Sequence, residues 1–381
     1  MKKKVCVVIA SRANYGRAKV LLQKIKKSKK LELQTVLAAS SLLEKYGDLR
    51  EILKKDKIKV NAEAFIVLEG ENTLTMAKST GIAIVELSSI FNNLKPDMII
   101  TIGDRYETIA TAIAASYMNK ILIHIQGGEI TGSIDESVRH AITKLSHLHF
   151  ASTIKSKKNI IRLGENKRNV YFSGCPSIDI LSENNRKKLS EYIKKTGVGS
   201  DININNPFYL VVFHPVTTKY EKSYKQTQIL INSIIKLNKQ VIWLWPNVDA
   251  GSDGISKCIR INREKNKLNK FRFFKNFPVE IYNELLKSAH CLIGNSSSFI
   301  REASYLGSPS IIVGERQLKR EKSKNVELVN FQENEIYKIV KKHEGKKFKR
   351  STIYGDGKAS ERIVKTLEQL KEINIQKSLN Y

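Results

Sequence analysis

The sequence predicts an α/β protein with two facing, doubly wound, Rossmann-like domains. Short apolar runs alternate with longer segments of helical periodicity along most of the chain, which is typical of parallel sheets covered by helices. A polar stretch rich in Asn, Lys and Ser interrupts this alternation over residues 179–206. With 381 residues and 41% hydrophobic content, the chain can bury a large core on each side of that stretch. We therefore expect an N-terminal domain over 1–178, a linker over 179–206 and a C-terminal domain over 207–381, with the last helix packing back on the N-terminal domain.

The first half alternates strand and helix signals from its start. Its strands are short apolar runs that end in turn or polar residues. The long helical pattern over 74–94 has Asn72 or Thr73 as its cap and stops at Lys95-Pro96, because the residue before a proline disfavours helical backbone. The predicted strands are 5–10, 33–39, 98–102, 121–125, 149–151 and 170–172, and the predicted helices are 15–25, 74–94, 107–118, 134–146 and 155–163.

The second half repeats this architecture without repeating its sequence. Each predicted strand is again short and apolar, and each is followed by a polar loop or a helix. The predicted strands are 208–213, 240–244, 271–274, 291–293 and 310–313, and the predicted helices are 224–237, 279–287, 299–306 and 359–370.

The formal net charge of +29 raises the question of a nucleic-acid partner, because clustered Lys and Arg bind phosphate backbones. The basic clusters are short and far apart, at 26–30, 54–55 and 346–347, and no RNP-like or zinc-finger pattern lies between them. We therefore expect a solvated basic surface and no nucleic-acid partner. The same field would favour a small anionic substrate.

The four cysteines, Cys6, Cys175, Cys258 and Cys291, stand alone, with no CxxC pair and no close His spacing. This pattern does not support the usual zinc cage or disulfide framework, so we expect no metal. No apolar run reaches the roughly 18 residues of a membrane span. The short apolar run at 5–10 fits a first strand better than a signal peptide. We expect a cytoplasmic protein with no membrane partner.

The turn after the predicted strand 121–125 is the most informative stretch of the chain. Gly127 and Gly128 let the backbone turn through positive φ at the carboxyl end of the strand, where ligands bind in such sheets. Ser133 and Glu136 have the spacing of a capping box. Carboxylates near a helix N-terminus stay ionised and can act as bases in a cleft, although they also serve as ordinary caps. The polar residues around this turn are His124, Gln126, Glu129, Asp135, Arg139 and His140.

Polar residues also follow other predicted strands. Arg12 follows the first strand, Asp104 follows the strand over 98–102, and His214 follows the first strand of the second half. Ligands bind outside the carboxyl ends of such strands. In two facing domains these residues would line a cleft that contains both acids and cations.

The stretch 293–302, with the sequence IGNSSSFIRE, predicts a phosphate site in the second domain. Gly, Asn and Ser at a strand-to-helix turn present backbone N–H groups and hydroxyls to an anion, although a Ser-rich turn is also a common helix cap. Glu302 can accept hydrogen bonds from a ribose diol, and Arg316 follows the next strand with a fixed positive charge. Neither GxGxxG after the first strand nor GxxxxGKS/T is present, so a Rossmann dinucleotide site and a P-loop are not supported.

Taken together, these motifs resemble the hydrolysing UDP-N-acetylglucosamine 2-epimerases, which make the first committed intermediate of sialic acid synthesis. The resemblance covers nearly the whole chain in order, and it implies the two-domain fold of the glycosyltransferase-B type. The motifs that carry it are 11–16 (SRANYG), 103–105 (GDR), 124–147, 214–218 (HPVTT), 246–252 (PNVDAGS), 294–297 (GNSS) and 354–357 (YGDG).

The resemblance implies that the C-terminal domain binds UDP and that the N-terminal domain supplies the acid and base groups. Asp104, Gln126 and Asp135 match the acid and base positions. Many relatives carry Glu where this chain has Gln126, and a neutral amide cannot accept a proton, so Glu129 is a candidate substitute. The residues implied for binding the substrate and UDP are Arg12, Arg105, His124, His214, Asn247, Ser296, Ser297, Glu302 and Arg316.

The implied reaction converts UDP-N-acetylglucosamine and water to UDP and N-acetylmannosamine. UDP leaves C1 while a carboxylate removes the C2 proton, water adds to the resulting 2-acetamidoglucal, and a proton returns to C2 from the opposite face. No cofactor is required, and we expect a homodimer or a homotetramer. Three alternatives stay open: UDP-N,N'-diacetylbacillosamine as the substrate on the legionaminic acid route, a non-hydrolysing epimerase, and a glycosyltransferase.

Overall fold

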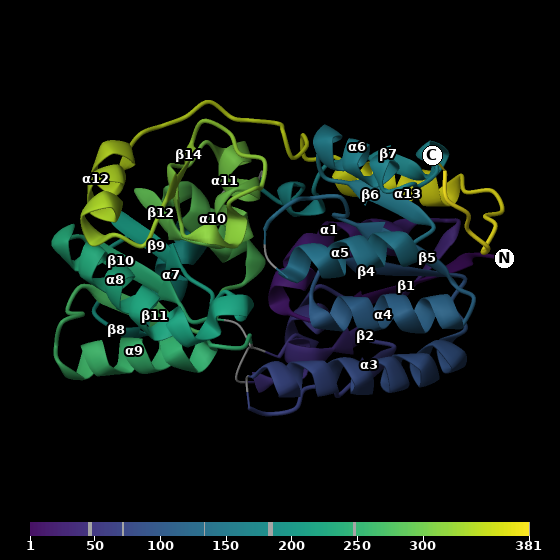
Figure 1. Ribbon diagram of the computed structural model, residues 1–381, viewed down its shortest axis with the longest axis horizontal. Coiled ribbons are helices and arrows are strands. Elements are labelled where there is room, and N and C mark those ends of the chain that lie inside the picture. The colour runs from purple at the N-terminus through teal and green to yellow at the C-terminus, as the bar shows by residue number, and fades with distance from the viewer. Residues whose placement is uncertain (45–47, 71, 133, 182–185, 247–248, 381) are drawn as a thin grey trace.

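The computed structural model describes residues 1–44, 48–70, 72–132, 134–181, 186–246 and 249–380, and within them the chain forms two seven-stranded sheets. The two sheets and their helices lie side by side as two domains (Figure 1). Both ends of the chain lie at the N-terminal domain. The predicted class, two doubly wound α/β domains, is confirmed.

The first sheet is wholly parallel and has the strand order β3-β2-β1-β4-β5-β6-β7. Val5, Val7 and Ile9 of β1 enter the core on one face, and Cys6 and Val8 enter the core on the other. Burial on both faces explains why its strands read as unbroken apolar runs. The strands are β1 (Lys3–Ile9), β2 (Leu31–Ala38), β3 (Ala62–Ala64), β4 (Met98–Ile102), β5 (Ile121–Ile125), β6 (Leu148–Ala151) and β7 (Val170–Phe172), and the helices are α1 (Arg12–Lys27), α2 (Arg50–Lys55), α3 (Thr73–Leu94), α4 (Tyr106–Tyr117), α5 (Ile134–Leu145) and α6 (Ile154–Arg162).

The second sheet has the order β14-β13-β12-β9-β10-β11-β8 and is parallel except for β8, which runs antiparallel to β11. Its central strand β9 also separates two cores, with Tyr209 and Val211 on one face and Leu210 and Val212 on the other. The strands are β8 (Val198–Gly199), β9 (Phe208–Val212), β10 (Gln240–Leu244), β11 (Phe271–Phe274), β12 (Cys291–Gly294), β13 (Ser310–Val313) and β14 (Val326–Val329), and the helices are α7 (Arg186–Lys195), α8 (Ser223–Lys236), α9 (Ser252–Glu264), α10 (Val279–Ser288), α11 (Arg301–Leu306) and α12 (Glu333–His343).

Several elements differ from the sequence-based expectation. The stretch 179–206, expected as a linker, includes α7 and β8, and β8 pairs with the second sheet. Leu189 and Ile193 are the buried residues of α7 and stand among lysines, which made its helical period hard to recognise. α9 was not predicted either. It contains Gly254, and glycine weakens a helical signal. The helix expected over 299–306 begins at Arg301, after a short 3-10 turn.

α3 is long and apolar enough, by length and composition alone, to cross a membrane. It lies beside α4 and buries Ala83, Leu87 and Phe91 in the first domain. A capping box fixes its start: Asn72 Oδ1 accepts a hydrogen bond from Thr75 N at 2.9 Å, and Thr75 Oγ1 accepts one from Asn72 N at 3.2 Å. Because α3 packs beside α4 and buries apolar side chains in the first domain, we interpret it as a helix of the domain surface.

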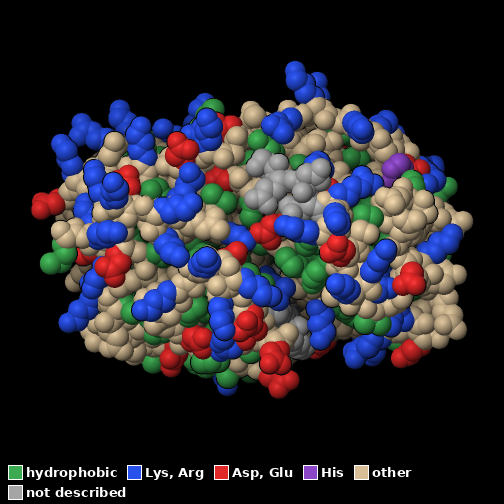
Figure 2. All heavy atoms as spheres, turned by 180° about the vertical axis from the view of Figure 1, so that it is seen from behind, with side chains coloured by type: hydrophobic (Ala, Val, Ile, Leu, Met, Phe, Trp, Pro, Cys, Tyr) green, Lys and Arg blue, Asp and Glu red, His purple; other side chains and the backbone are tan. Residues whose placement is uncertain are grey.

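The excess positive charge is spread over the surface that Figure 2 shows. Lys and Arg side chains lie across both domains and are interspersed with acidic ones, rather than gathered in one patch. This distribution is typical of solvated surface charge.

α13 (Ala359–Glu368) comes last in the chain but packs on the first domain. It contacts α1, and its Ile363 and Leu367 are fully buried in the core that contains β1. Figure 1 shows the chain crossing back from the second domain to reach it. Gly174 and Gly355 lie where the two crossing segments meet, and a Cβ on either would come within 2.9 Å of the other's Cα. Both have positive φ, so glycine is required at this crossing.

Leu367→Ala should lower the free energy of unfolding by about 2–5 kcal/mol, because it leaves a cavity in a closed core. Leu74→Ala is the matched control, because Leu74 is 61% exposed, and it should change stability by less than about 0.5 kcal/mol. Urea unfolding followed by circular dichroism measures both variants. Equal changes in the free energy of unfolding for the two variants would contradict the packing of α13 on the first domain.

Candidate active site

Each sheet reverses its strand order at one pair of strands. In the first sheet the reversal lies between β1 and β4, and in the second it lies between β9 and β12. Ligands of doubly wound proteins bind in the crevice outside the carboxyl ends of such strands. The loops after these strands carry Ser11, Asp104, His214 and Asn295, so the polar motifs of the sequence stand where a ligand is expected.

Side-chain hydrogen bonds fix these loops. Ser11 Oγ accepts from Asn14 N at 3.1 Å and caps α1. Asn295 Oδ1 accepts from His214 N at 2.8 Å, and Asn295 Nδ2 donates to His214 O at 2.7 Å. The loops after β9 and β12 are therefore tied together, and Asn295 is fully buried between them.

Two adjoining cavities lie between the domains. The first cavity contains Asp104 and Asp135, and the second contains Glu302. Because the two cavities share lining residues, they form one continuous groove lined by both domains. The shared residues are Ser11, Ala13, Arg17, His214, Ser296 and Ser297.

Asp104 and Asp135 face the first cavity with opposite shifts of pKa. Burial would raise the pKa of Asp104, but Arg139, whose Nε donates to Asp104 Oδ2 at 2.9 Å, outweighs burial together with Arg320 and Arg17 and holds that pKa well below its usual range. Burial, together with the nearby Asp104, raises the pKa of Asp135 to about 6. Carboxylates whose environments push their pKa values apart are typical of acid–base pairs.

Arg105 joins the domains at the first cavity. Its Nη1 donates to Asp249 Oδ1 of the second domain at 2.8 Å, and its Nε donates to the buried Glu107 at 2.7 Å. Although burial alone would raise the pKa of Asp249, Arg105 lowers it. Burial lowers the pKa of His214 to about 3, so this ring is neutral and can both donate and accept a hydrogen bond.

The second domain supplies hydroxyls and cations to the first cavity. Ser297 Oγ accepts from Arg301 Nη1 at 3.3 Å and from Arg17 Nη2 at 3.5 Å. Arg316 and Ser296 line the same cavity. Hydroxyls and guanidinium groups gathered at one place suit an anion with several oxygens, such as a phosphate.

The second cavity combines a buried acceptor with aromatic rings. Glu302, on the first turn of α11, has an Oε2 atom with no hydrogen-bond partner among the described residues. Phe277, Tyr282, Trp245 and Arg12 line the same space. An acceptor beside flat apolar groups suits a nucleoside, whose ribose donates hydrogen bonds and whose base is planar.

Comparisons with known proteins agree with this geometry. A sequence profile described as UDP-N-acetylglucosamine 2-epimerase matches residues 23–368. The UDP-N,N'-diacetylbacillosamine 2-epimerase (hydrolyzing) of Legionella pneumophila is 32% identical over 371 residues, which cover 97% of this chain and 97% of that protein. The chain belongs to the UDP-N-acetylglucosamine 2-epimerase family.

Other members of this family are similar over most of their length. The GDP/UDP-N,N'-diacetylbacillosamine 2-epimerase (hydrolyzing) of Campylobacter jejuni is 31% identical over 92% of this chain and 90% of that protein. The structure of UDP-GlcNAc 2-epimerase from Neisseria meningitidis bound to UDP-GlcNAc has a TM-score of 0.79 at 19% identity, and covers 96% of this chain and 100% of that one. The resemblance seen in the sequence, and the glycosyltransferase-B-like fold that it implies, are confirmed.

Two residues inferred from the family resemblance line neither cavity. His124 is fully buried, and its Nε2 lies 2.9 Å from Gly103 O while its Nδ1 lies 3.2 Å from Thr143 Oγ1. It therefore holds the loop before Asp104 against α5. Gln126 is buried with a φ of 72°, and its Nε2 donates to Cys175 Sγ at 3.1 Å, toward the segment where the chain crosses between domains.

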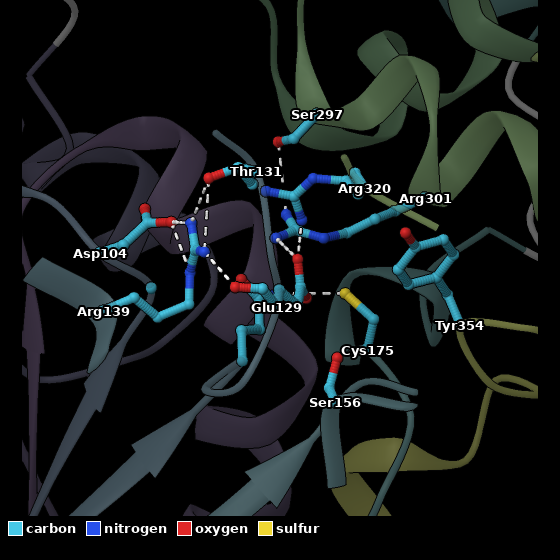
Figure 3. A network of polar contacts seen from close by, with 12 residues as sticks. Asp104, Glu129, Thr131, Arg139, Ser156, Cys175, Ser297, Arg301, Arg320 and Tyr354 are labelled. Atoms are coloured by element: carbon cyan, nitrogen blue, oxygen red, sulfur yellow. Dashed lines mark hydrogen bonds and ion pairs between the residues drawn. The ribbon is translucent and has the colours of Figure 1, made fainter. Parts of the chain in front are cut away.

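Glu129, the candidate substitute for the usual family Glu, also lies outside both cavities. Its side chain pairs with Arg301 and Arg320, and its backbone oxygen accepts a hydrogen bond from Arg139 (Figure 3). It therefore faces cations rather than the space beside Asp135. Asn247, and Ser133 of the expected capping box, lie outside the described residues.

Some cavity residues carried no clear signal in the sequence. Arg17 lies one helical turn after Ala13, which lines the same cavity, so the period of α1 could have indicated it. Arg301 precedes Glu302 in the Ser-rich motif, whereas Arg320 belongs to no motif. Within the described ranges, no group of three His, Cys, Asp or Glu side chains could hold a metal ion.

Proposed function

We propose that this epimerase-family protein is a hydrolysing UDP-sugar 2-epimerase that holds its substrate across both cavities. The observation that carries the proposal is the overlap of the cavities at Ser11, Arg17, His214 and Ser297. Hydroxyls, an imidazole and a guanidinium group suit a diphosphate. The nucleoside then extends into the second cavity, toward Glu302, and the sugar extends into the first.

We assign removal of the C2 proton to Asp135. A carboxylate with a pKa of about 6 is ionised at neutral pH and is a stronger base than Asp104, whose pKa is held low. UDP leaves C1 as the proton is removed, and Arg17, Arg301 and Arg320 stabilise the charge of the leaving group. Water then adds at C1 of the 2-acetamidoglucal and a proton returns to C2 from the opposite face, giving UDP and the free 2-epimeric sugar.

Incubation with a UDP-2-acetamido sugar in deuterium oxide tests this reaction. We expect NMR to show UDP and a free 2-epimeric sugar that carries deuterium at C2, because the proton lost in the elimination is replaced from solvent. Release of a UDP-linked epimer would indicate a non-hydrolysing enzyme instead. A product that keeps its original C2 proton would exclude the elimination.

The pH profile of kcat/KM tests the role of Asp135. A base must be ionised, so kcat/KM should fall about tenfold per pH unit below about pH 6 and stay level just above it. Asp135→Asn should abolish deuterium incorporation. Asp201→Asn, which changes a fully exposed side chain, should leave the pH profile and the deuterium incorporation unchanged. A wild-type profile that stays level down to pH 4.5 would contradict the assignment.

We further propose UDP-N,N'-diacetylbacillosamine as the preferred substrate, with UDP-N-acetylglucosamine, the first expectation from the sequence, as the second candidate. Met76, Tyr106 and Val216 line the first cavity but not the second, so in the proposed orientation of the substrate they would lie beside the sugar. These apolar groups suit the 6-methyl group of a 2,4-diacetamido-trideoxy sugar better than a 6-hydroxyl group. The names of the Legionella pneumophila and Campylobacter jejuni relatives support the same choice.

Met76→Gln tests this substrate preference. It should lower the ratio of kcat/KM for the diacetamido substrate over UDP-N-acetylglucosamine by about tenfold, because one methyl contact in an apolar pocket is worth about that factor. Leu74→Gln, on the exposed side of the same helix, should leave the ratio unchanged. A wild-type enzyme that favours UDP-N-acetylglucosamine would make the second candidate the substrate.

A further inference from the structure

Glu129 joins the two domains through buried charge. It lies in the loop between β5 and α5, and its side chain is 3% exposed. Its Oε2 accepts a hydrogen bond from Arg301 Nη2 at 2.8 Å and also pairs with Arg320. Both arginines belong to the second domain, and Figure 3 shows their guanidinium groups converging on this carboxylate.

Arg301 and Arg320 also line the first cavity, which Glu129 does not. Arg301 Nη1 donates to Ser297 Oγ at 3.3 Å, and Arg301 Nε is buried with no hydrogen-bond partner in the described part of the chain. A buried donor without a partner is unfavourable, so a ligand oxygen in the cavity would complete it. A diphosphate supplies such oxygens, and its place beside Ser297 rests on the proposed function.

Arg301 and Arg320 carry two positive charges and share one negative charge, that of Glu129. Both guanidinium groups are buried, and Asp104, which pairs with Arg139, also acts on Arg320 through its charge. A buried cation needs a compensating anion. Glu129 and Asp104 supply part of that compensation, and a bound diphosphate would add to it. Because Glu129 and the diphosphate act on the same cations, each lowers the affinity of the cations for the other.

We propose that Glu129 is a positioning residue that partly neutralises Arg301 and Arg320 before UDP binds and thereby limits the affinity of the enzyme for UDP. It orients both guanidinium groups toward the leaving group without contacting the sugar. Its negative charge favours departure of the product, which carries more negative charge than the UDP-sugar. Proton transfer is not assigned to it, because it lies outside the cavity that contains Asp135.

Glu129→Gln tests this role, because the amide keeps the shape of the side chain and removes its charge. Isothermal titration with UDP should give a Kd about tenfold lower than that of the wild type, within the usual range of coupling between two sites. Inhibition by added UDP should strengthen by the same factor. The product formed in deuterium oxide should still carry deuterium at C2.

Two matched variants separate charge from structure. Glu129→Asp keeps the charge and should leave the Kd for UDP close to the wild-type value. Glu165→Gln removes another buried carboxylate, which pairs with Lys144 and Lys377 at 2.7 Å in the first domain and lines neither cavity. It should leave the Kd for UDP unchanged even if it lowers the melting temperature.

An unchanged or higher Kd for UDP in Glu129→Gln would overturn the proposal, as would loss of deuterium incorporation, which would identify Glu129 as a base. If Glu129→Gln does not fold, the comparison is made between Arg320→Gln and the double variant Glu129→Gln/Arg320→Gln, where the double variant should bind UDP more tightly. A wild-type enzyme that does not bind UDP would count against the proposed function and not against this role of Glu129.

Discussion

The placement of the two domains depends on buried and half-buried ion pairs that cross between them. Glu129 with Arg301, and Arg105 with Asp249, each join a residue of the first domain to one of the second. Removing one partner of such a pair leaves an uncompensated buried charge, which is strongly destabilising. Because both arginines also line the first cavity, the contacts that orient the domains also set the charge that a ligand meets.

The chemistry divides between the domains in the same way. The first domain places its carboxylates, Asp104 and Asp135, after β4 and at the start of α5, and the second domain places hydroxyls and guanidinium groups after β12. The division is not complete, because Arg316 of the second domain acts against burial and Asp104 to lower the pKa of Asp135. A change in the angle between the domains would therefore alter the strength of the base as well as the shape of the groove.

Sequence periodicity identified the elements whose residues are buried on both faces, because these form unbroken apolar runs. The strand ends before Asp104 and His214 could also be predicted, because the change from an apolar run to a polar residue is visible in the sequence alone. α7 was missed because its buried residues are few, and β8 because it is only two residues long. A two-residue strand carries no period that could be recognised.

Contacts between distant parts of the chain could not be predicted in this way. Glu129 and Arg301 are 172 residues apart, and nothing in either motif indicates the other. The same limit applies to Gln126 and His124, which stand in a polar motif but point into buried contacts rather than into a cavity. A motif locates a loop, whereas the direction of each side chain depends on what the rest of the fold packs against it.

A crystal structure of the enzyme with UDP bound tests the central claim most directly. We expect the ribose hydroxyls at Glu302 in the second cavity and the diphosphate between Arg17 and Ser297, with the terminal phosphate directed toward the cavity that contains Asp135. UDP bound with its base beside Asp135, or bound outside the groove between the domains, would contradict the account.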